Sequence, residues 1–385
     1  MKVRALFLTC AIFSPALACS AQMSPRARDL GVPFDGTPGP LNAITDVRGV
    51  EVGYRTLISG EGKLHVGVGP VRTGVTAIFP RGKNSTDPVF AASFAENGNG
   101  EMTGAAWVEE AGFLYAPMMI TNTHSVGVVR DAVIGWQFKR AAPGSLDDWW
   151  SLPVVTETWD GYLNDINGFH VKPEDALAAI DDAHAGPIAE GNVGGGTGMI
   201  CFEFKDGTGT SSRKLAEKFG GYTVGVLVQC NTSLHRLLRI AGVPVGREIS
   251  GQNIWDSETG SIIVVVATDA PLLPHQLKRV ARRVTLALGR MGSISGNDSG
   301  DIFIAFSTAN REAGSAQKPA AAFMLPNAQI DEIFEATVEA TEEAIVNALV
   351  AAKTMTGADN HTVKALPHDQ LRETLKKYNR LVEVK

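Results

Sequence analysis

An uninterrupted apolar run at residues 261–268 (Ser-Ile-Ile-Val-Val-Val-Ala-Thr) is the clearest structural pattern in this sequence. A run of β-branched residues of this length is typical of a strand that is buried on both faces. Residues 274–290 differ, because their apolar side chains recur at helical spacing and their Lys and Arg side chains fall on the other side. The pattern predicts a buried strand followed closely by an amphipathic helix.

Strand-like and helix-like segments alternate along the rest of the chain. Further strands are expected at 75–79, 199–204, 222–229 and 302–306, and further helices at 126–138, from Pro173 onward, at 331–355 and at 368–378. The stretch 248–260 is polar and ends abruptly at the buried strand. This junction is the first candidate for a functional site.

The composition is that of a folded protein, since 44% of the 385 residues are hydrophobic and 20% are charged. At about 150 residues per domain, the length suggests two domains or one large unit. The net charge of −6 gives no basic footprint, so we expect no nucleic-acid partner. The 41 glycines cluster in short loops, which suggests a site that uses backbone groups.

The N-terminus has the pattern of an export signal. Lys2 and Arg4 precede a short apolar stretch, and Ala16-Leu17-Ala18 fits a cleavage site. We therefore expect a signal peptide at residues 1–21 and a periplasmic or secreted protein. A lipoprotein anchored at Cys19 is the less favoured alternative. No later apolar run reaches the ~18 residues of a membrane span, so we expect no membrane-spanning segment.

Two cysteines, Cys201 and Cys230, lie in the part expected to be exported. An oxidising compartment permits a disulfide between them, and two buried free thiols are an equally good interpretation. The sequence has no C-x-x-C pair, no H-E-x-x-H and no Walker P-loop, and the glycine run at 191–198 does not fit a dinucleotide-binding fingerprint. We expect neither a metal nor a cofactor. The absence of G-x-S-x-G also disfavours an α/β-hydrolase serine.

The Gly260–Ser261 junction offers another kind of nucleophile. A cut there gives Ser261 a free α-amino group beside its hydroxyl, and such an amine has a pKa near 7.7–8.0 that suits a general base. The alternative is an ordinary boundary between a loop and a strand.

Several long motifs carry a resemblance that bears on this choice. They are Pro38-Gly-Pro-Leu-Asn-Ala-Ile-Thr-Asp-Val-Arg-Gly-Val-Glu-Val-Gly53, Glu190-Gly-Asn-Val-Gly-Gly-Gly-Thr-Gly-Met199, Gly225-Val-Leu-Val-Gln-Cys-Asn231, Gly260-Ser-Ile-Ile-Val-Val-Val-Ala-Thr-Asp-Ala-Pro-Leu272 and Gly300-Asp-Ile-Phe-Ile-Ala-Phe-Ser-Thr-Ala-Asn310. In these motifs the sequence resembles the self-processing DmpA/BapA-type aminopeptidases. The resemblance implies an α+β fold, a four-layer αββα sandwich of the N-terminal-nucleophile type. It also implies one catalytic domain at 22–385, cut into an α chain (22–260) and a β chain (261–385).

The resemblance also implies roles for individual residues. Ser261 matches the nucleophile, Ser299 the second serine of the family, and Asp301 its acidic partner, which is a longer glutamate in some members. Asn231 matches the side-chain donor to the oxyanion, a task that suits a neutral amide.

A second group of residues matches the substrate pocket. Glu157 resembles the carboxylate that receives the substrate's N-terminal ammonium, and Trp159 and Tyr162 are expected to line the same pocket. Some members use a tyrosine hydroxyl as an additional oxyanion donor. If Trp159 occupies that position here, only its indole N–H can donate. The sequence therefore does not identify the second oxyanion donor.

The expected activity is that of a metal-independent serine aminopeptidase. It releases an N-terminal β-amino acid or small L-α-amino acid from peptides, amides or esters through an acyl-enzyme on Ser261, and the resemblance implies a homotetramer of αβ units. The alternatives are an acyl transferase like ornithine acetyltransferase, whose group uses threonine, and a non-catalytic exported binding protein.

Overall fold

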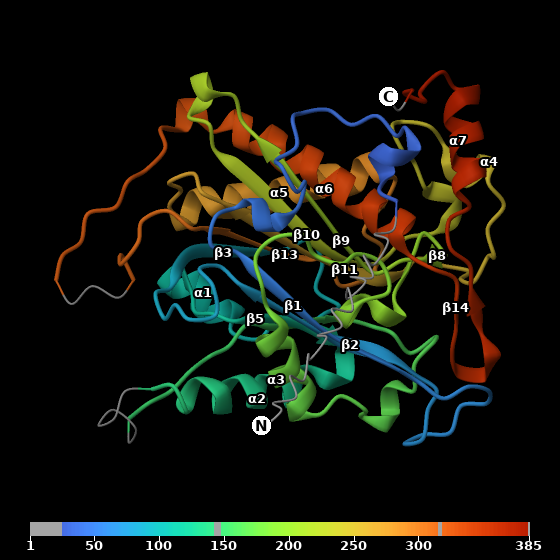
Figure 1. Ribbon diagram of the computed structural model, residues 1–385, viewed down its shortest axis with the longest axis horizontal. Helices are drawn as coiled ribbons and strands as arrows, with labels where there is room; N and C mark the ends of the chain where they lie inside the picture. Colours follow the sequence, from blue (N-terminus) through green and yellow to red (C-terminus); the bar gives the residue numbers. More distant parts are fainter. Residues whose placement is uncertain (1–24, 142–147, 315–317, 384–385) are drawn as a thin grey trace, which may run out of the picture.

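The computed structural model describes residues 25–141, 148–314 and 318–383. A larger and a smaller β-sheet lie face to face, and helices cover the outer face of each sheet (Figure 1). This arrangement is the predicted αββα sandwich. The predicted signal peptide and Cys19 lie outside the described residues.

The larger sheet contains the predicted buried strand at its centre. Its strands lie in the order β4 (Phe113–Leu114), β3 (Val89–Ala95), β13 (Ile302–Ser307), β11 (Thr259–Thr268), β10 (Thr223–Asn231) and β9 (Thr208–Lys214). Neighbours in this order run antiparallel, except that β11 and β13 are parallel. The short β12 (Asp298–Ser299) pairs with the first residues of β11.

The smaller sheet and the helices complete the four layers. The sheet has the order β1 (Glu51–Ser59), β2 (Val71–Phe79), β5 (Met118–Asn122) and β6 (Val155–Thr158). Helices α5 (Pro274–Met291) and α6 (Asp331–Ala351) cover the larger sheet, and α2 (Val126–Phe138) and α3 (Pro173–Asp182) cover the smaller one (Figure 1). The remaining α-helices of the described residues are α1 (Ala105–Ala111), α4 (Val245–Glu248) and α7 (His368–Lys377). Two small hairpins lie outside these sheets: β7 (Ile200–Cys201) pairs with β8 (Phe204–Lys205), and β14 (Met355–Thr356) pairs with β15 (Thr362–Val363).

Strand β11 shows why its sequence is apolar throughout. Ile262, Val264 and Val266 belong to the core beneath the helices, whereas Ile263 and Val265 belong to the core between the two sheets. Because side chains alternate across a strand, a strand in the middle of four layers needs apolar residues at every position.

One predicted strand takes a different form. Residues 199–204 do not extend as one strand but turn back as the β7–β8 hairpin, since Phe202 (φ 49°) and Glu203 (φ 59°) are in the left-handed region. Glu203 accepts hydrogen bonds from two distant backbone N–H groups, which compensate the strain at this turn. The long helix ends at Ala351, before the expected residue 355. In the described part of the protein, no helix has both the length and the apolar character needed to cross a membrane.

Candidate active site

The candidate site lies where β10 ends and β11 begins. Asn231 and Ser261 are direct partners in the antiparallel ladder of these strands, and both are almost buried, with 6% and 5% of their surface exposed. A cavity of about 710 Å³ opens beside them and is also lined by Glu157, Trp159 and Tyr162. The cavity lining extends from Gly98 to Asp298, so the fold brings together residues that are up to 200 positions apart in the sequence.

Ser299 and Asp301 lie beside the start of the strand that carries Ser261, and both are fully buried. Residue 299 is the β12 partner of Gly260, and the Ser299 hydroxyl donates a 2.7 Å hydrogen bond to Oδ1 of Asp301. The same carboxylate oxygen accepts the backbone N–H of Ile262 at 3.2 Å. Burial raises the pKa of Asp301, and the Ser299 hydrogen bond opposes that rise. Ser299 therefore pairs with the residue before Ser261, and Asp301 bonds to the residue after it.

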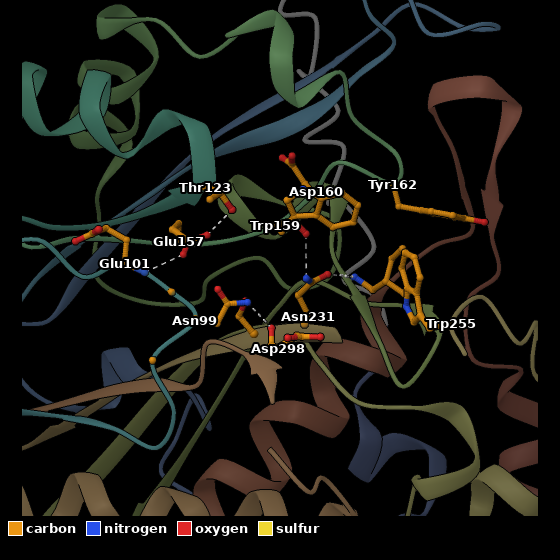
Figure 2. Close-up of a pocket in the computed structure, with 16 residues that line it drawn as sticks. Asn99, Glu101, Thr123, Glu157, Trp159, Asp160, Tyr162, Asn231, Trp255 and Asp298 are labelled. Carbon is orange, nitrogen blue, oxygen red and sulfur yellow. Dashed lines mark hydrogen bonds between the residues drawn. The ribbon is translucent and has the colours of Figure 1, made fainter. Parts of the chain in front are cut away.

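The amide of Asn231 has a fixed orientation. Its Oδ1 accepts the backbone N–H of Ile200 at 2.8 Å, and its Nδ2 donates to the carbonyl oxygen of Trp159 at 2.9 Å (Figure 2). A side-chain amide nitrogen carries two hydrogens, so one donor of Nδ2 remains for a group in the cavity.

Glu157 lies at another part of the cavity wall, on β6. Its Oε1 accepts the backbone N–H of Glu101 at 2.9 Å, and its Oε2 accepts the hydroxyl of Thr123, which follows the neighbouring strand β5 (Figure 2). Only 3% of Glu157 is exposed, and burial raises the pKa of its carboxyl. A buried carboxylate with two donors is a suitable site for a substrate cation.

Other residues of the cavity were not anticipated from the sequence. They are Gly98, Asn99, Gly100, Glu101, Thr123, Asp160, Ile200, Trp255 and Asp298. Trp255 belongs to the polar stretch 248–260, and Asp160 directly follows Trp159. Nothing in the local sequence indicated that either side chain lines the cavity. Asn99 donates to the carbonyl oxygen of Asp298 at 2.8 Å, and the contact of Glu101 with Glu157 forms only when the two sheets pack together.

The sequence profile of peptidase family S58 matches residues 42–363. The chain belongs to peptidase family S58. It is 58% identical to the beta-peptidyl aminopeptidase BapA of Sphingosinicella microcystinivorans, and the match covers 96% of both proteins. The beta-aminopeptidase of Burkholderia sp. has a similar structure, with a TM-score of 0.85 and 46% sequence identity; the match covers 92% of this chain and 99% of that chain. The L-aminopeptidase D-Ala-esterase/amidase of Ochrobactrum anthropi is also similar, with a TM-score of 0.86 and 47% identity over 93% of this chain and 100% of that chain.

These relatives confirm the predicted fold class and enzyme class of the S58 protein. The Ochrobactrum enzyme is described as a prototype of the serine aminopeptidases and a variant of the Ntn hydrolase fold. The protein is therefore a hydrolase of the DmpA/BapA type of serine aminopeptidase. The acyl transferase and the non-catalytic binding protein, considered as alternatives from the sequence, are set aside.

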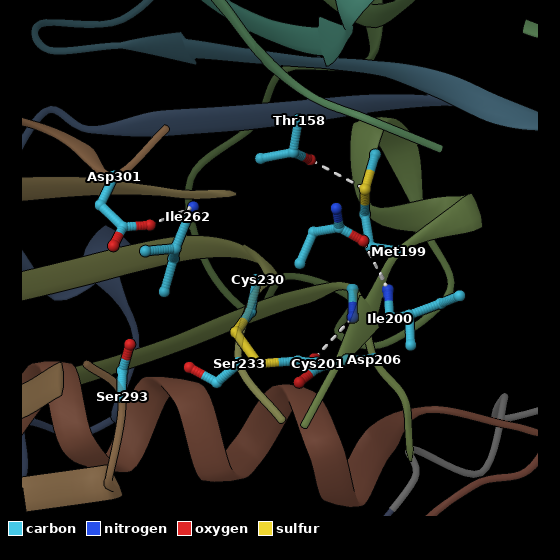
Figure 3. The surroundings of a disulfide bond; sticks show 12 residues. Thr158, Met199, Ile200, Cys201, Asp206, Cys230, Ser233, Ile262, Ser293 and Asp301 are labelled. Atoms are coloured by element: carbon cyan, nitrogen blue, oxygen red, sulfur yellow. Dashed lines mark hydrogen bonds between the residues drawn. A yellow bond between two sulfur atoms is a disulfide. The ribbon is translucent and has the colours of Figure 1, made fainter. Parts of the chain in front are cut away.

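A disulfide joins the S58 site to the β7–β8 hairpin. Cys201 and Cys230 are bonded, with 5.7 Å between their Cα atoms (Figure 3). The sequence left this pairing open. Among the described residues, the two sulfurs and a carboxylate oxygen of Asp206 lie within 4.8 Å of one another. Because the sulfurs are bonded to each other, they do not offer the thiolates that a metal ion needs.

Buried charges lie next to the same hairpin. Nζ of Lys205 donates to the carbonyl oxygens of Met199 at 2.7 Å and Asp206 at 2.5 Å, and burial lowers the pKa of Lys205 to about 7. Burial likewise raises the pKa of Asp160 to about 6, although the side-chain amide of Asn164 donates to its Oδ1 at 2.9 Å. Lys205 thus bonds to the backbone on both sides of the hairpin, at Met199 directly before Ile200 and at Asp206.

Proposed function

We propose that this S58 peptidase cuts its own backbone between Gly260 and Ser261 and then removes N-terminal β-amino acids from peptides and amides. The observation that carries the proposal is the pairing of Ser261 with Asn231 beside a cavity that also contains the buried carboxylate of Glu157. The name of the 58% identical relative, a beta-peptidyl aminopeptidase, supports the substrate class.

The junction suits self-cleavage. The hydroxyl of Ser261 attacks the carbonyl carbon of Gly260, the C–N bond breaks as an ester forms, and the hydroxyl proton passes to the nitrogen, which becomes the free α-amine of Ser261. Water then hydrolyses the ester, which releases the carboxylate of Gly260 and restores the Ser261 hydroxyl. The carbonyl oxygen of Gly260 accepts the backbone N–H of Gly300 at 3.0 Å, a donor in position to stabilise the oxyanion. Glycine is required at 260, because φ is +153° and a Cβ would lie 2.2 Å from the carbonyl oxygen of Asn231.

The same serine then acts on substrates. Its free amine takes the hydroxyl proton, the oxygen attacks the substrate carbonyl, and the remaining donor of Asn231 Nδ2 stabilises the tetrahedral oxyanion. The proton passes to the leaving amine, and water hydrolyses the acyl-enzyme. Ser299 and Asp301 act as positioning residues, because the carboxylate binds both the Ser299 hydroxyl and the N–H of Ile262, the residue after the nucleophile.

Glu157 gives the activity its exopeptidase character. Its carboxylate binds the substrate's N-terminal ammonium, and an internal peptide nitrogen carries no charge to occupy that site. A β-amino acid places its ammonium one methylene farther from the scissile carbonyl than an α-amino acid does. The distance between Glu157 and the nucleophile therefore selects the substrate class, and Trp159 lines the cavity beside this space.

Three further features belong to the proposal. The two chains, 22–260 and 261–385, stay together as one catalytic domain, because β11 crosses the cut and runs through the centre of the core. The αβ units form a homotetramer, as the family resemblance implies. The N-terminal signal pattern supports export to the periplasm or beyond, with lipid anchoring at Cys19 as the less favoured route.

A denaturing gel and N-terminal sequencing test the proposal. Self-cleavage gives fragments of about 25 and about 13 kDa from the two predicted chains, and the smaller fragment begins at Ser261. The Ser261→Ala variant stays uncut and inactive. Processing at another bond, or persistent processing in Ser261→Ala, overturns the nucleophile. For the substrate class, kcat/KM is compared for the p-nitroanilides of β-alanine and L-alanine; faster cleavage of the L-alanine compound overturns the β preference.

A further inference from the structure

We propose that Trp255 and Tyr162 form a subsite for the leaving group, which makes the enzyme favour substrates with a large apolar or aromatic residue directly after the scissile bond. This inference rests on the proposed function, since it takes Glu157 as the ammonium site and Asn231 as the oxyanion donor. It concerns the part of the substrate that leaves as the amine, whereas the proposed function concerns the N-terminal residue that is released.

The order of residues along the cavity supports this direction. In Figure 2, Asn231 lies between Glu157 on one side and Trp255 and Tyr162 on the other, and all four residues line the same cavity. A substrate whose ammonium contacts Glu157 and whose carbonyl oxygen contacts Asn231 extends its leaving group toward the two aromatic rings. The N-terminal residue itself occupies the segment between Glu157 and Asn231.

The aromatic rings form a continuous wall. The rings of Trp255 and Tyr162 meet edge to face with centroids 5.0 Å apart, and Trp159 contacts Trp255 in the same way at 6.3 Å. His361 stacks on Tyr162 at 4.3 Å and so fixes the plane of its ring. Trp255 and Tyr162 are only partly buried, so ring surface remains for a ligand. Such surfaces bind apolar and aromatic side chains through a large contact area and ring–ring contacts.

Trp255 is held in place independently of the cut. Its backbone N–H donates at 2.8 Å to Oε1 of Glu203, and Oε2 of the same carboxylate accepts the N–H of His235 at 3.0 Å. Glu203 is buried, with 3% of its surface exposed. This anchor precedes Gly260 in the sequence, so release of the new carboxyl terminus at Gly260 leaves Trp255 attached to the β7–β8 hairpin. The wall is therefore present in the processed enzyme.

The negative charge of the cavity also affects which leaving groups it accepts. Its described lining residues include four carboxylates, Glu101, Glu157, Asp160 and Asp298, and no Lys, Arg or His. A free carboxylate on the leaving group finds no cation there and is repelled. The subsite therefore suits amidated or longer peptides better than free dipeptides. A test of ring contacts consequently uses amidated substrates, in which this repulsion is absent.

The test compares leaving groups behind one N-terminal residue. Processed wild-type enzyme is assayed with β-alanyl-phenylalanine amide and β-alanyl-glycine amide, and kcat/KM is expected to favour the phenylalanine compound about tenfold, as burial of an aromatic side chain implies. In Trp255→Ala and in Tyr162→Ala this ratio falls toward one, and Trp255→Phe restores part of it. Trp150→Ala, at an exposed tryptophan outside the cavity lining, keeps the wild-type ratio.

Two measurements separate this inference from the proposed function. The processed fraction is measured on a gel for each variant, because Trp255 lies close to the cut, and rates are normalised to processed enzyme. An unchanged ratio in both Ala variants, with Ser261→Ala still inactive, overturns the subsite and leaves the proposed function standing. If Trp255→Ala instead changes the preference between N-terminal residues and not between leaving groups, the aromatic wall contacts the acyl side and the inference is wrong.

Discussion

The backbone N–H of Ile200 donates a 2.8 Å hydrogen bond to Oδ1 of Asn231, and this contact determines which way the amide points (Figure 2). With Oδ1 turned toward Ile200, only the nitrogen end of the amide is left to face other groups. The hairpin that carries Ile200 is joined to the strand of Asn231 by the Cys201–Cys230 disulfide. A residue 31 positions away thus orients the proposed oxyanion donor.

Replacement of Asn231 tests this orientation. Asn231→Ala removes the donor, and kcat is expected to fall by about 10²–10³, the loss found for single oxyanion-hole donors. Asn231→Asp is expected to lose more, because a carboxylate repels both the oxyanion and the carbonyl oxygen of Trp159. The measurement is steady-state kinetics on enzyme whose processed fraction is known. Equal activity of wild type and Asn231→Ala contradicts the assignment.

The raised pKa of Glu157 predicts an acid limb in the pH profile. Burial raises this pKa, so the carboxyl is protonated, and the proposed ammonium site loses its charge, at a higher pH than an ordinary glutamate. As the pH falls through that value, kcat/KM is expected to fall with it. Glu157→Gln keeps an acceptor for the Glu101 N–H but carries no charge; we expect kcat/KM to drop about a hundredfold and this limb to disappear. The α-amine of Ser261, the proposed general base, gives an acid limb of its own in both proteins; a Glu157→Gln profile with the same shape as that of the wild type contradicts the assignment of a limb to Glu157.

The disulfide predicts a redox effect on catalysis. Peptide mapping of the denatured, alkylated protein is expected to find Cys201 and Cys230 joined. The bond closes a loop with a sequence separation of 29, so its loss in the double variant Cys201→Ala, Cys230→Ala is expected to cost about 3 kcal/mol of stability. Because the bond holds the hairpin that orients Asn231, kcat is expected to fall more than KM changes. Free thiols at both positions in the native enzyme refute this prediction.

The buried carboxyl of Asp160 predicts a stability effect with a definite sign. Its pKa is about 6 in the folded protein, above the ordinary 3.8, so the folded state holds the proton more tightly than the unfolded state does. The stability contributed by this group therefore falls as the pH rises from about 4 to about 6 and remains lost above that range.

Asp160→Asn removes this dependence and retains an acceptor for the Asn164 amide. Between pH 4 and pH 8 the variant is expected to gain about 3 kcal/mol relative to the unsubstituted protein. The measurement is chemical denaturation in a Ser261→Ala background, which is expected to remain one polypeptide. Asp131→Asn, at a side chain that is 81% exposed, serves as the control. A constant difference between the two proteins across this pH range contradicts the proposed burial effect.

Local patterns in the sequence predicted the elements whose environment is uniform. Strand β11 is apolar at each position because both of its faces are buried, and α5 has a clear apolar stripe because one face meets the larger sheet. The β7–β8 hairpin was missed for the opposite reason. Its residues are apolar enough for one strand, and two residues with positive φ, held by Glu203 and by the packing around it, reverse the backbone direction there.

The sequence by itself determined several of the strands and helices, the family, and the identity of the proposed nucleophile, because these depend on local periodicity and on long contiguous motifs. Only the tertiary structure decided the contacts of those residues. It placed Thr123 on Glu157, Ile200 on Asn231 and Trp255 on the cavity wall. The physical reason is that a site between two packed sheets consists of contacts between distant segments, and such contacts leave no periodic pattern in any one segment.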